Sequence, residues 1–294
     1  MPRASTEKAV YLAVFAPVLV ALSAVSLVSA DPAYAADVVY APPAAASPVF
    51  TAKSASDWTI TLGAEGRVMP EFQGATSSTF RPVPIFRIRR AGSKDRFRSA
   101  FDGFSLALLD TGRFAVGPTA KFRYRREEGD SDSLRGLGNV DWTLEVGAFA
   151  EFWATDWLRT RAELRQGIGG HHGLVADLSA DIVQPVTSQL TLSGGPRLTL
   201  SSASAVSPYF DITAAQSAAS GLPVYDAGGG LSSYGVGAQA RYAWTPQWAS
   251  HVFVEYSRLA GDVANSPLVA QRGSRDQIQV GIGTTYSFDV PGLW

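Results

Sequence analysis

The chain contains no cysteine among its 294 residues. This absence excludes disulfide bonds, thiolate metal sites and a lipidated N-terminal cysteine. An excess of one charge is also missing, because 25 Lys and Arg residues nearly balance 26 Asp and Glu residues. No basic tract is present, so nucleic acid is not expected as a partner. Beyond the N-terminal region no apolar run is long enough for a helical membrane span.

One long apolar run does occur, from residue 9 to residue 30. Arg3 and Lys8 precede it, and Ala33 and Ala35 follow it with the small-residue spacing of a signal-peptidase site. This order predicts a cleaved signal peptide over residues 1–35, with an N-terminal membrane anchor as the alternative. The Pro-, Ala- and Ser-rich residues 36–57 are expected to form a flexible periplasmic tail. An exported chain without cysteine fits a bacterial envelope protein.

From Trp58 onward the sequence alternates between apolar and polar residues. In WTITLGAEGRV, for example, Trp58, Ile60 and Leu62 alternate with polar or small residues. Alternation over segments of this length predicts β-strands rather than helices. The pattern recurs at residues 114–126, 141–153, 158–166, 175–183, 190–200, 234–244, 248–257 and 277–288.

Two all-β architectures produce such strands, a soluble sandwich or barrel and an outer-membrane barrel. In a membrane barrel the apolar face meets lipid, and aromatic residues gather at both interfaces. The apolar faces here often begin or end in aromatic residues: Trp58, Trp142, Phe152, Tyr234, Trp244, Trp248, Tyr286 and Phe288. This favours the outer membrane of a Gram-negative bacterium, with membrane lipid as a partner.

The connections between strands alternate strictly between short and long. Those at 109–113, 154–157, 185–189 and 245–248 are short, whereas 126–140, 201–233 and 260–275 are long and polar. Short periplasmic turns and long extracellular loops are typical of outer-membrane barrels. We therefore predict an all-β, antiparallel transmembrane β-barrel over residues 58–294. It should have twelve strands, or ten, because residues 80–109 do not divide clearly.

The predicted inner faces carry charges whose sign alternates from strand to strand. Opposite charges across neighbouring strands stabilise a sheet by a fraction of a kcal/mol each. The sequence therefore predicts a structural charge network in the lumen, the alternative being a charged eyelet that selects small solutes. Its candidate members are Lys121, Arg123, Arg125, Glu145, Glu151, Arg159, Arg161, Glu163, Arg165, Asp177 and Asp181.

Several segments resemble the family of outer-membrane proteins named for the MltA-interacting protein (MipA) and OmpV. The most specific are QSAASGLPVYDAGGG (216–230) and GDVANSPLV (261–269). The resemblance covers residues 58–288 and implies an outer-membrane barrel. One family member is implicated as a scaffold that joins a murein lytic transglycosylase to a murein synthase, and others are described as adhesins. The resemblance brings no catalytic motif and no cofactor.

The remaining motifs have structural explanations. The run EEGDSDS (127–133) could bind a divalent cation, but it lacks the spacing of a calcium loop and is expected to be a solvated loop. The small residues 214–219 predict a short helix ended by Gly221, in a loop that folds over the barrel mouth. Ser217 and Asp226 lack the Gly-x-Ser-x-Gly elbow of a hydrolase.

His171 and His172 stand in GGHHG, between two predicted strands. We expect a tight outer turn in which Gly169, Gly170 and Gly173 supply positive φ angles and the histidines lie at the barrel rim, where they could sense pH. A catalytic set built from these histidines or His251 is not favoured, because the Ser and Asp residues that follow GGHHG are better explained as lining of the lumen. No enzyme, metal site or cofactor is therefore predicted. The leading function is an envelope scaffold for murein enzymes; a narrow pore or ligand-binding barrel and a surface adhesin are the alternatives.

Overall fold

The computed structural model describes residues 58–90 and 97–291. By its internal contacts the chain divides into residues 1–51 and 52–294, and all described residues belong to the second unit. The predicted signal peptide (1–35) and tail (36–57) lie outside the described residues, so both remain predictions.

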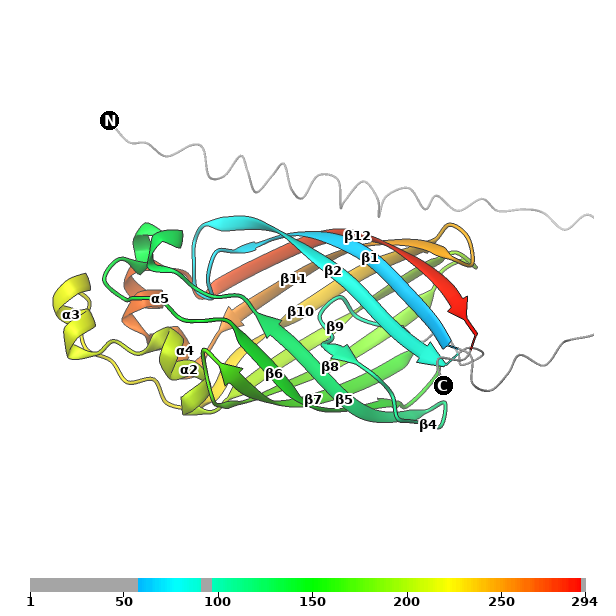
Figure 1. Cartoon of the computed structure of the whole chain (residues 1–294), viewed down its shortest axis with the longest axis horizontal. Coiled ribbons are helices and arrows are strands. Elements are labelled where there is room, and N and C mark those ends of the chain that lie inside the picture. The colour runs from blue at the N-terminus through cyan, green and yellow to red at the C-terminus, as the bar shows by residue number, and fades with distance from the viewer. Residues whose placement is uncertain (1–57, 91–96, 292–294) are drawn as a thin grey trace, which may run out of the picture. The chain divides into compact units, whose positions relative to one another are not determined.

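The second unit is an antiparallel β-barrel, which confirms the predicted fold class (Figure 1). Its sheet contains twelve strands in the order β2-β1-β12-β11-β10-β9-β8-β7-β6-β5-β3, with β4 paired to β5. The strands are β1 (Trp58–Pro70), β2 (Ser78–Arg90), β3 (Phe104–Ser105), β4 (Leu109–Asp110), β5 (Phe114–Arg123), β6 (Thr143–Trp153), β7 (Leu158–Gly169), β8 (Leu174–Pro185), β9 (Leu190–Ser201), β10 (Gly230–Ala243), β11 (Trp248–Leu259) and β12 (Asp276–Val290).

The wall is formed by ten of these strands, each between 10 and 15 residues long. The other two, β3 and β4, contain 2 residues each and come from the stretch that the sequence pattern could not divide. Strands β2 and β3 end the hydrogen-bonded path. Across this seam the rings of Phe86 and Phe104 stack with 5.8 Å between their centroids. Pro82 and Pro84 suit an edge strand, because proline has no amide hydrogen to donate to a neighbouring strand.

The barrel is apolar outside and charged inside. Leu164 and Ile182 are each 55 % exposed on the outer face, whereas Arg159 is fully buried on the inner face. Trp142, Trp244 and other strand-end aromatics are also exposed on the outside. An exposed apolar band of this kind is stable in lipid and not in water. Within the described ranges, no helix is long and apolar enough to cross a membrane.

The two ends of the barrel differ. Trp58 pairs with Val290, so β1 begins and β12 ends at the end that carries the short turns. By the rule for outer-membrane barrels this is the periplasmic end. The helices lie at the opposite end (Figure 1): the short 3-10 helices Glu128–Asp130 and Asp132–Leu134, and α2 (Ala203–Phe210), α3 (Ala214–Ser220), α4 (Gly261–Asn265) and α5 (Pro267–Arg272).

The long loops pack into a cap that has its own apolar core. One cluster joins Phe72, Leu134, Ile212 and Leu268, and a second surrounds Phe210. Helix α3 forms where the small residues predicted it, and it ends at Gly221, whose φ of 75° is the left-handed conformation that glycine adopts readily. Because loops from four parts of the chain share buried side chains, the cap is a packed structure over the barrel mouth.

Candidate functional site

Strand β7 provides the central charges of the lumen. Its residues alternate between buried and exposed, and Arg159, Arg161, Glu163 and Arg165 all lie on the buried face. Each is at most 6 % exposed. A charged group this far from water is tolerated only when it is paired and hydrogen-bonded. The partners of these four side chains therefore determine how the lumen is built.

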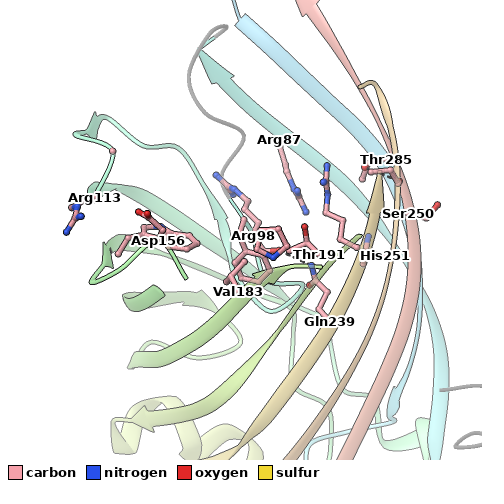
Figure 2. A pocket seen from close by; sticks show the side chains of 16 residues that line it. Arg87, Arg98, Arg113, Asp156, Val183, Thr191, Gln239, Ser250, His251 and Thr285 are labelled. Atoms are coloured by element: carbon pink, nitrogen blue, oxygen red, sulfur yellow. Dashed lines mark hydrogen bonds between the residues drawn. The ribbon is translucent and has the colours of Figure 1, made fainter. Parts of the chain in front are cut away.

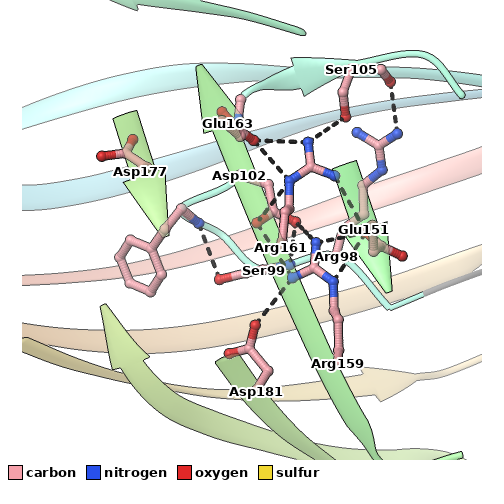
Figure 3. A network of polar contacts seen from close by, with 12 residues as sticks. Arg98, Ser99, Asp102, Ser105, Glu151, Arg159, Arg161, Glu163, Asp177 and Asp181 are labelled. Atoms are coloured by element: carbon pink, nitrogen blue, oxygen red, sulfur yellow. Dashed lines mark hydrogen bonds and ion pairs between the residues drawn. The ribbon is translucent and has the colours of Figure 1, made fainter. Parts of the chain in front are cut away.

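Arg159 is held by three carboxylates (Figure 3). Its guanidinium lies 2.6 Å from Asp102, 2.9 Å from Glu151 and 3.1 Å from Asp181. All four side chains are at most 6 % exposed. Arg197 joins the cluster from β9 through a 2.5 Å contact with the other oxygen of Asp181.

Arg161 connects the cluster around Arg159 to Glu163, which lies further along β7 toward the cap. Its guanidinium lies 3.3 Å from Glu151 and 2.8 Å from Glu163, and its Nη2 donates to the hydroxyl of Ser105 at 3.0 Å. The guanidinium also stacks on Phe149, 4.0 Å from the ring centroid. A planar guanidinium suits this position, because it can donate in several directions and cover a ring at once.

Arg165 forms the level nearest the cap. It contacts Glu145 at 2.9 Å, Glu163 at 2.5 Å and Asp177 at 2.6 Å. The same acids are shared with β5, because Arg123 lies 2.5 Å from Glu145 and Lys121 lies 3.3 Å from Asp177. The structure thus brings together the predicted charges of four neighbouring strands, β5 to β8.

Arg125 is the exception among the predicted lumen residues. Strand β5 ends at Arg123, and the side chain of Arg125 is 66 % exposed and pairs with Glu127 in the loop. The alternating pattern extends past the true end of the strand, because loop residues can continue it without being paired. The assignment of Arg125 to the lumen is therefore corrected to the extracellular loop.

The GGHHG segment is an outer turn, but its histidines are not equivalent. His171 is 1 % exposed and lies 3.2 Å from Glu145, so it belongs to the ion network rather than the open rim. Only His172 is exposed. Of the three glycines expected at positive φ, only Gly169 has it, at 108°. Gly170 and Gly173 are required for another reason, since a Cβ would lie 2.1 Å from the backbone of Asp141 or Ala205.

An inward segment, residues 97–103, was not foreseen from the sequence. It follows β2 within the chain and crosses the lumen before β3. Asp102 binds Arg159, the amide of Gly103 donates to Glu163 at 3.1 Å, and the amide of Ala100 donates to Gln239 of β10 at 2.8 Å. The ring of Phe101 packs edge-on against Phe253 of β11, with centroids 5.0 Å apart. The segment thus contacts β7 on one side of the barrel and β10 and β11 on the other.

A second buried polar group lies across the barrel from β7, on strands β11 and β1. His251 of β11 faces inward, with its Nε2 2.5 Å from Glu65 of β1. Arg67 also pairs with Glu65 and donates to the carbonyl of Ala100 at 2.8 Å. Glu65 and Arg67 could have been found from their inward positions on the alternating strand, since a charge on an inner face needs a partner.

The acidic and histidine side chains that were considered as metal ligands or catalytic groups have defined surroundings in the structure. Among the described residues, no three His, Cys, Asp or Glu side chains gather as metal ligands would. Asp177 accepts from Arg165 and Thr199, and His171 faces Glu145. In the EEGDSDS run, Glu128 accepts from the amides of Gly136 and Gly138, so its carboxylate orders the loop.

A cavity of about 350 Å³ lies on the periplasmic side of the inward segment (Figure 2). Phe97 and Arg98 of the inward segment line it, together with residues from the lower parts of the strands such as Thr191, Gln239 and Arg241. Phe97 and Arg98 thus form an inner wall of this cavity, which we call the vestibule.

An antiparallel barrel with an apolar outer face and a charged inner face is an outer-membrane β-barrel. The chain matches the family described as MltA-interacting protein MipA over residues 62–288, and it belongs to that family. This confirms the family resemblance seen in the sequence.

Solved structures of outer-membrane barrels are similar in fold at low sequence identity. An outer membrane channel from Pseudomonas putida F1 has 12 % identity and a TM-score of 0.40, over 79 % of this chain and 95 % of that chain. The KdgM porin has 10 % identity and a TM-score of 0.34, over 78 % and 99 %. OmpT of Vibrio cholerae has 9 % identity and a TM-score of 0.36, over 80 % and 99 %. A search of curated proteins finds no match.

Proposed function

We propose that this protein is a closed, non-enzymatic scaffold of the outer membrane whose periplasmic end docks a murein lytic transglycosylase and a murein synthase. The observation that carries the proposal is the inward segment, which is bonded to both sides of the barrel. The inward segment is bonded to Arg159 of β7 through Asp102 and to Gln239 of β10 through the amide of Ala100, and we infer that it closes the lumen to solutes. A closed barrel offers other envelope proteins its end surfaces. The family description, which names interaction with MltA, supports the periplasmic end.

The pore alternative is less well supported. A selective pore needs a water-filled constriction lined by charges that are free to meet the permeating ion. Here the arginines of β7 are already engaged by carboxylates at 2.5 to 3.1 Å. The adhesin alternative would use the cap. The apolar residues of its two clusters are buried against one another, so they do not form an exposed binding surface.

Site-specific photocrosslinking in cells tests the docking proposal. A photoreactive residue placed at Ser188 or Pro246, both exposed in short turns, should crosslink to a lytic transglycosylase or a murein synthase. The same residue at Ala215, exposed in the cap, is the matched control and should not crosslink to either enzyme. Recovery of no murein enzyme from the turns, or equal recovery from Ala215, would overturn the proposed scaffold function.

A further inference from the structure

The seam between the two ends of the sheet continues past β3 toward the cap. Above Ala120, β5 pairs with β6 but not with β3. Its free edge there faces the cap end of β2, because the guanidinium of Arg81 lies 4.8 Å from the ring centroid of Tyr124. We call the stretch formed by residues 78–85 and residues 121–124 the upper seam.

The upper seam leaves two strand edges unpaired in the wall of the barrel. Within the described ranges, no backbone hydrogen bond joins its two sides. Hydrocarbon cannot satisfy backbone amides and carbonyls, so edges at this place need polar groups from another molecule. Pro82 and Pro84 lower the number of unpaired amides, because proline has no amide hydrogen, but they keep their carbonyls. The upper seam therefore favours a partner that brings polar groups to the wall.

Aromatic side chains place the upper seam at the boundary between lipid and water. The ring of Phe122 packs edge-on against Tyr124, with centroids 5.3 Å apart, and stacks on Trp142 at 6.1 Å. All three rings are exposed on the outer face, and Phe80 is exposed on the other side of the seam. Trp and Tyr gather at the depth of lipid headgroups. The outer face of the upper seam thus offers flat apolar surfaces beside a polar boundary.

Each edge of the upper seam brings one cation. Arg81 of β2 contacts the ring of Tyr124 and, among the described residues, no carboxylate. Stacking uses the flat face of a guanidinium, so its N–H groups stay available to acceptors in the plane. Lys121 of β5 lies 3.3 Å from Asp177, but its side chain is 41 % exposed, and Arg165 binds the same carboxylate oxygen at 2.6 Å. The two edges are therefore suited to an anion.

We propose that the upper seam binds the phosphate group of an anionic lipid from the extracellular leaflet. Arg81 donates to the phosphate oxygens, a pairing that guanidinium groups make with good geometry, and Lys121 adds positive charge from the other edge. The acyl chains lie along the exposed rings of Phe80 and Phe122. These apolar rings beside the cations favour a lipid over free phosphate. The proposal is independent of the scaffold function, because the site lies at the opposite end of the barrel from the short turns.

Native mass spectrometry of the full chain released from detergent micelles tests this site. The probes are dioleoyl phosphatidic acid, dioleoyl phosphatidylcholine as the lipid without net charge, and inorganic phosphate. One phosphatidic acid should be retained per chain, at least about tenfold more tightly than phosphatidylcholine, which corresponds to about 1.4 kcal/mol. Equal retention of the two lipids would overturn the proposal. Displacement of the lipid by inorganic phosphate at the same concentration would assign the site to free phosphate, and a dimer in place of the lipid would assign it to a second copy of the chain.

Variants identify the upper seam as the place of binding. Arg81→Gln leaves no described carboxylate without its partner, so it should fold, and it should weaken phosphatidic acid binding at least about tenfold. Arg81→Lys keeps the charge without the planar fork and should weaken binding less. Arg258→Gln is the matched control, because Arg258 lies near the same end of the barrel and already pairs with Asp276 at 2.6 Å. Unchanged binding in folded Arg81→Gln, or an equal loss in Arg258→Gln, would overturn the proposal.

Discussion

Replacing Arg159 with glutamine is expected to lower the free energy of unfolding by about 3–5 kcal/mol, the usual cost of removing one partner from a buried ion pair. The substitution leaves Asp102, Glu151 and Asp181 close together and without their shared cation. Each of these carboxylates is at most 6 % exposed, so water cannot replace the guanidinium. Urea unfolding in detergent or lipid vesicles, followed by tryptophan fluorescence, measures the change.

Two further variants separate this explanation from a general effect of losing an arginine. Arg258 pairs with Asp276 at an exposed site, where both side chains are more than 40 % exposed, so Arg258→Gln should destabilise the protein far less than Arg159→Gln. Arg159→Lys keeps the charge but cannot reach three carboxylates with a rigid fork, so it should fall between the other two. If Arg159→Gln and Arg258→Gln are equally stable, the ion network does not hold the barrel together.

Replacing residues 97–103 with glycine and serine is expected to open the lumen to the periplasm. The replacement removes the carboxylate of Asp102 and the ring of Phe101, two side chains that fix the segment against opposite walls. The native chain has no cysteine, so a single Thr199→Cys substitution gives one thiol on the inner face above the segment. Its reaction with a charged thiol reagent should be at least about tenfold faster in the replaced chain, because access no longer requires local opening.

The matched control replaces residues 129–132, in the extracellular loop, with glycine and serine in the same Thr199→Cys background. This change leaves the inward segment in place and should not alter the labelling rate. Equal labelling rates with and without residues 97–103 would show that the segment does not close the barrel.

The wall of the barrel could be predicted because its physical cause is local. A strand between lipid and a polar interior must alternate apolar and polar residues, so Trp58, Ile60 and Leu62 already indicate which side faces out. The ladder Arg159, Arg161, Glu163 and Arg165 follows from the same period. The pairing of Arg165 with Asp177 could also be anticipated, because consecutive antiparallel strands are neighbours in the sheet.

The contents of the barrel could not be predicted in the same way. Residues 97–103 are not a strand and have no periodic pattern, and the partners of Asp102 and Phe101 lie on strands far along the chain. The position of His171 had a similar cause. It is buried partly because Tyr209 of helix α2 lies beside it, with ring centroids 6.1 Å apart, and that contact joins two separate loops. Alternation along one strand carries no information about such contacts.

The most direct test of the closed barrel compares two single-cysteine variants of the otherwise intact protein in native outer membranes. Thr191→Cys lies in the wall of the vestibule, and Thr199→Cys lies on the same inner face of β9, above the inward segment. With a charged thiol reagent supplied on both sides of the membrane, Thr191→Cys should be labelled and Thr199→Cys should be protected until the protein is unfolded. Labelling of both thiols at the same rate in the folded protein would contradict the closed barrel.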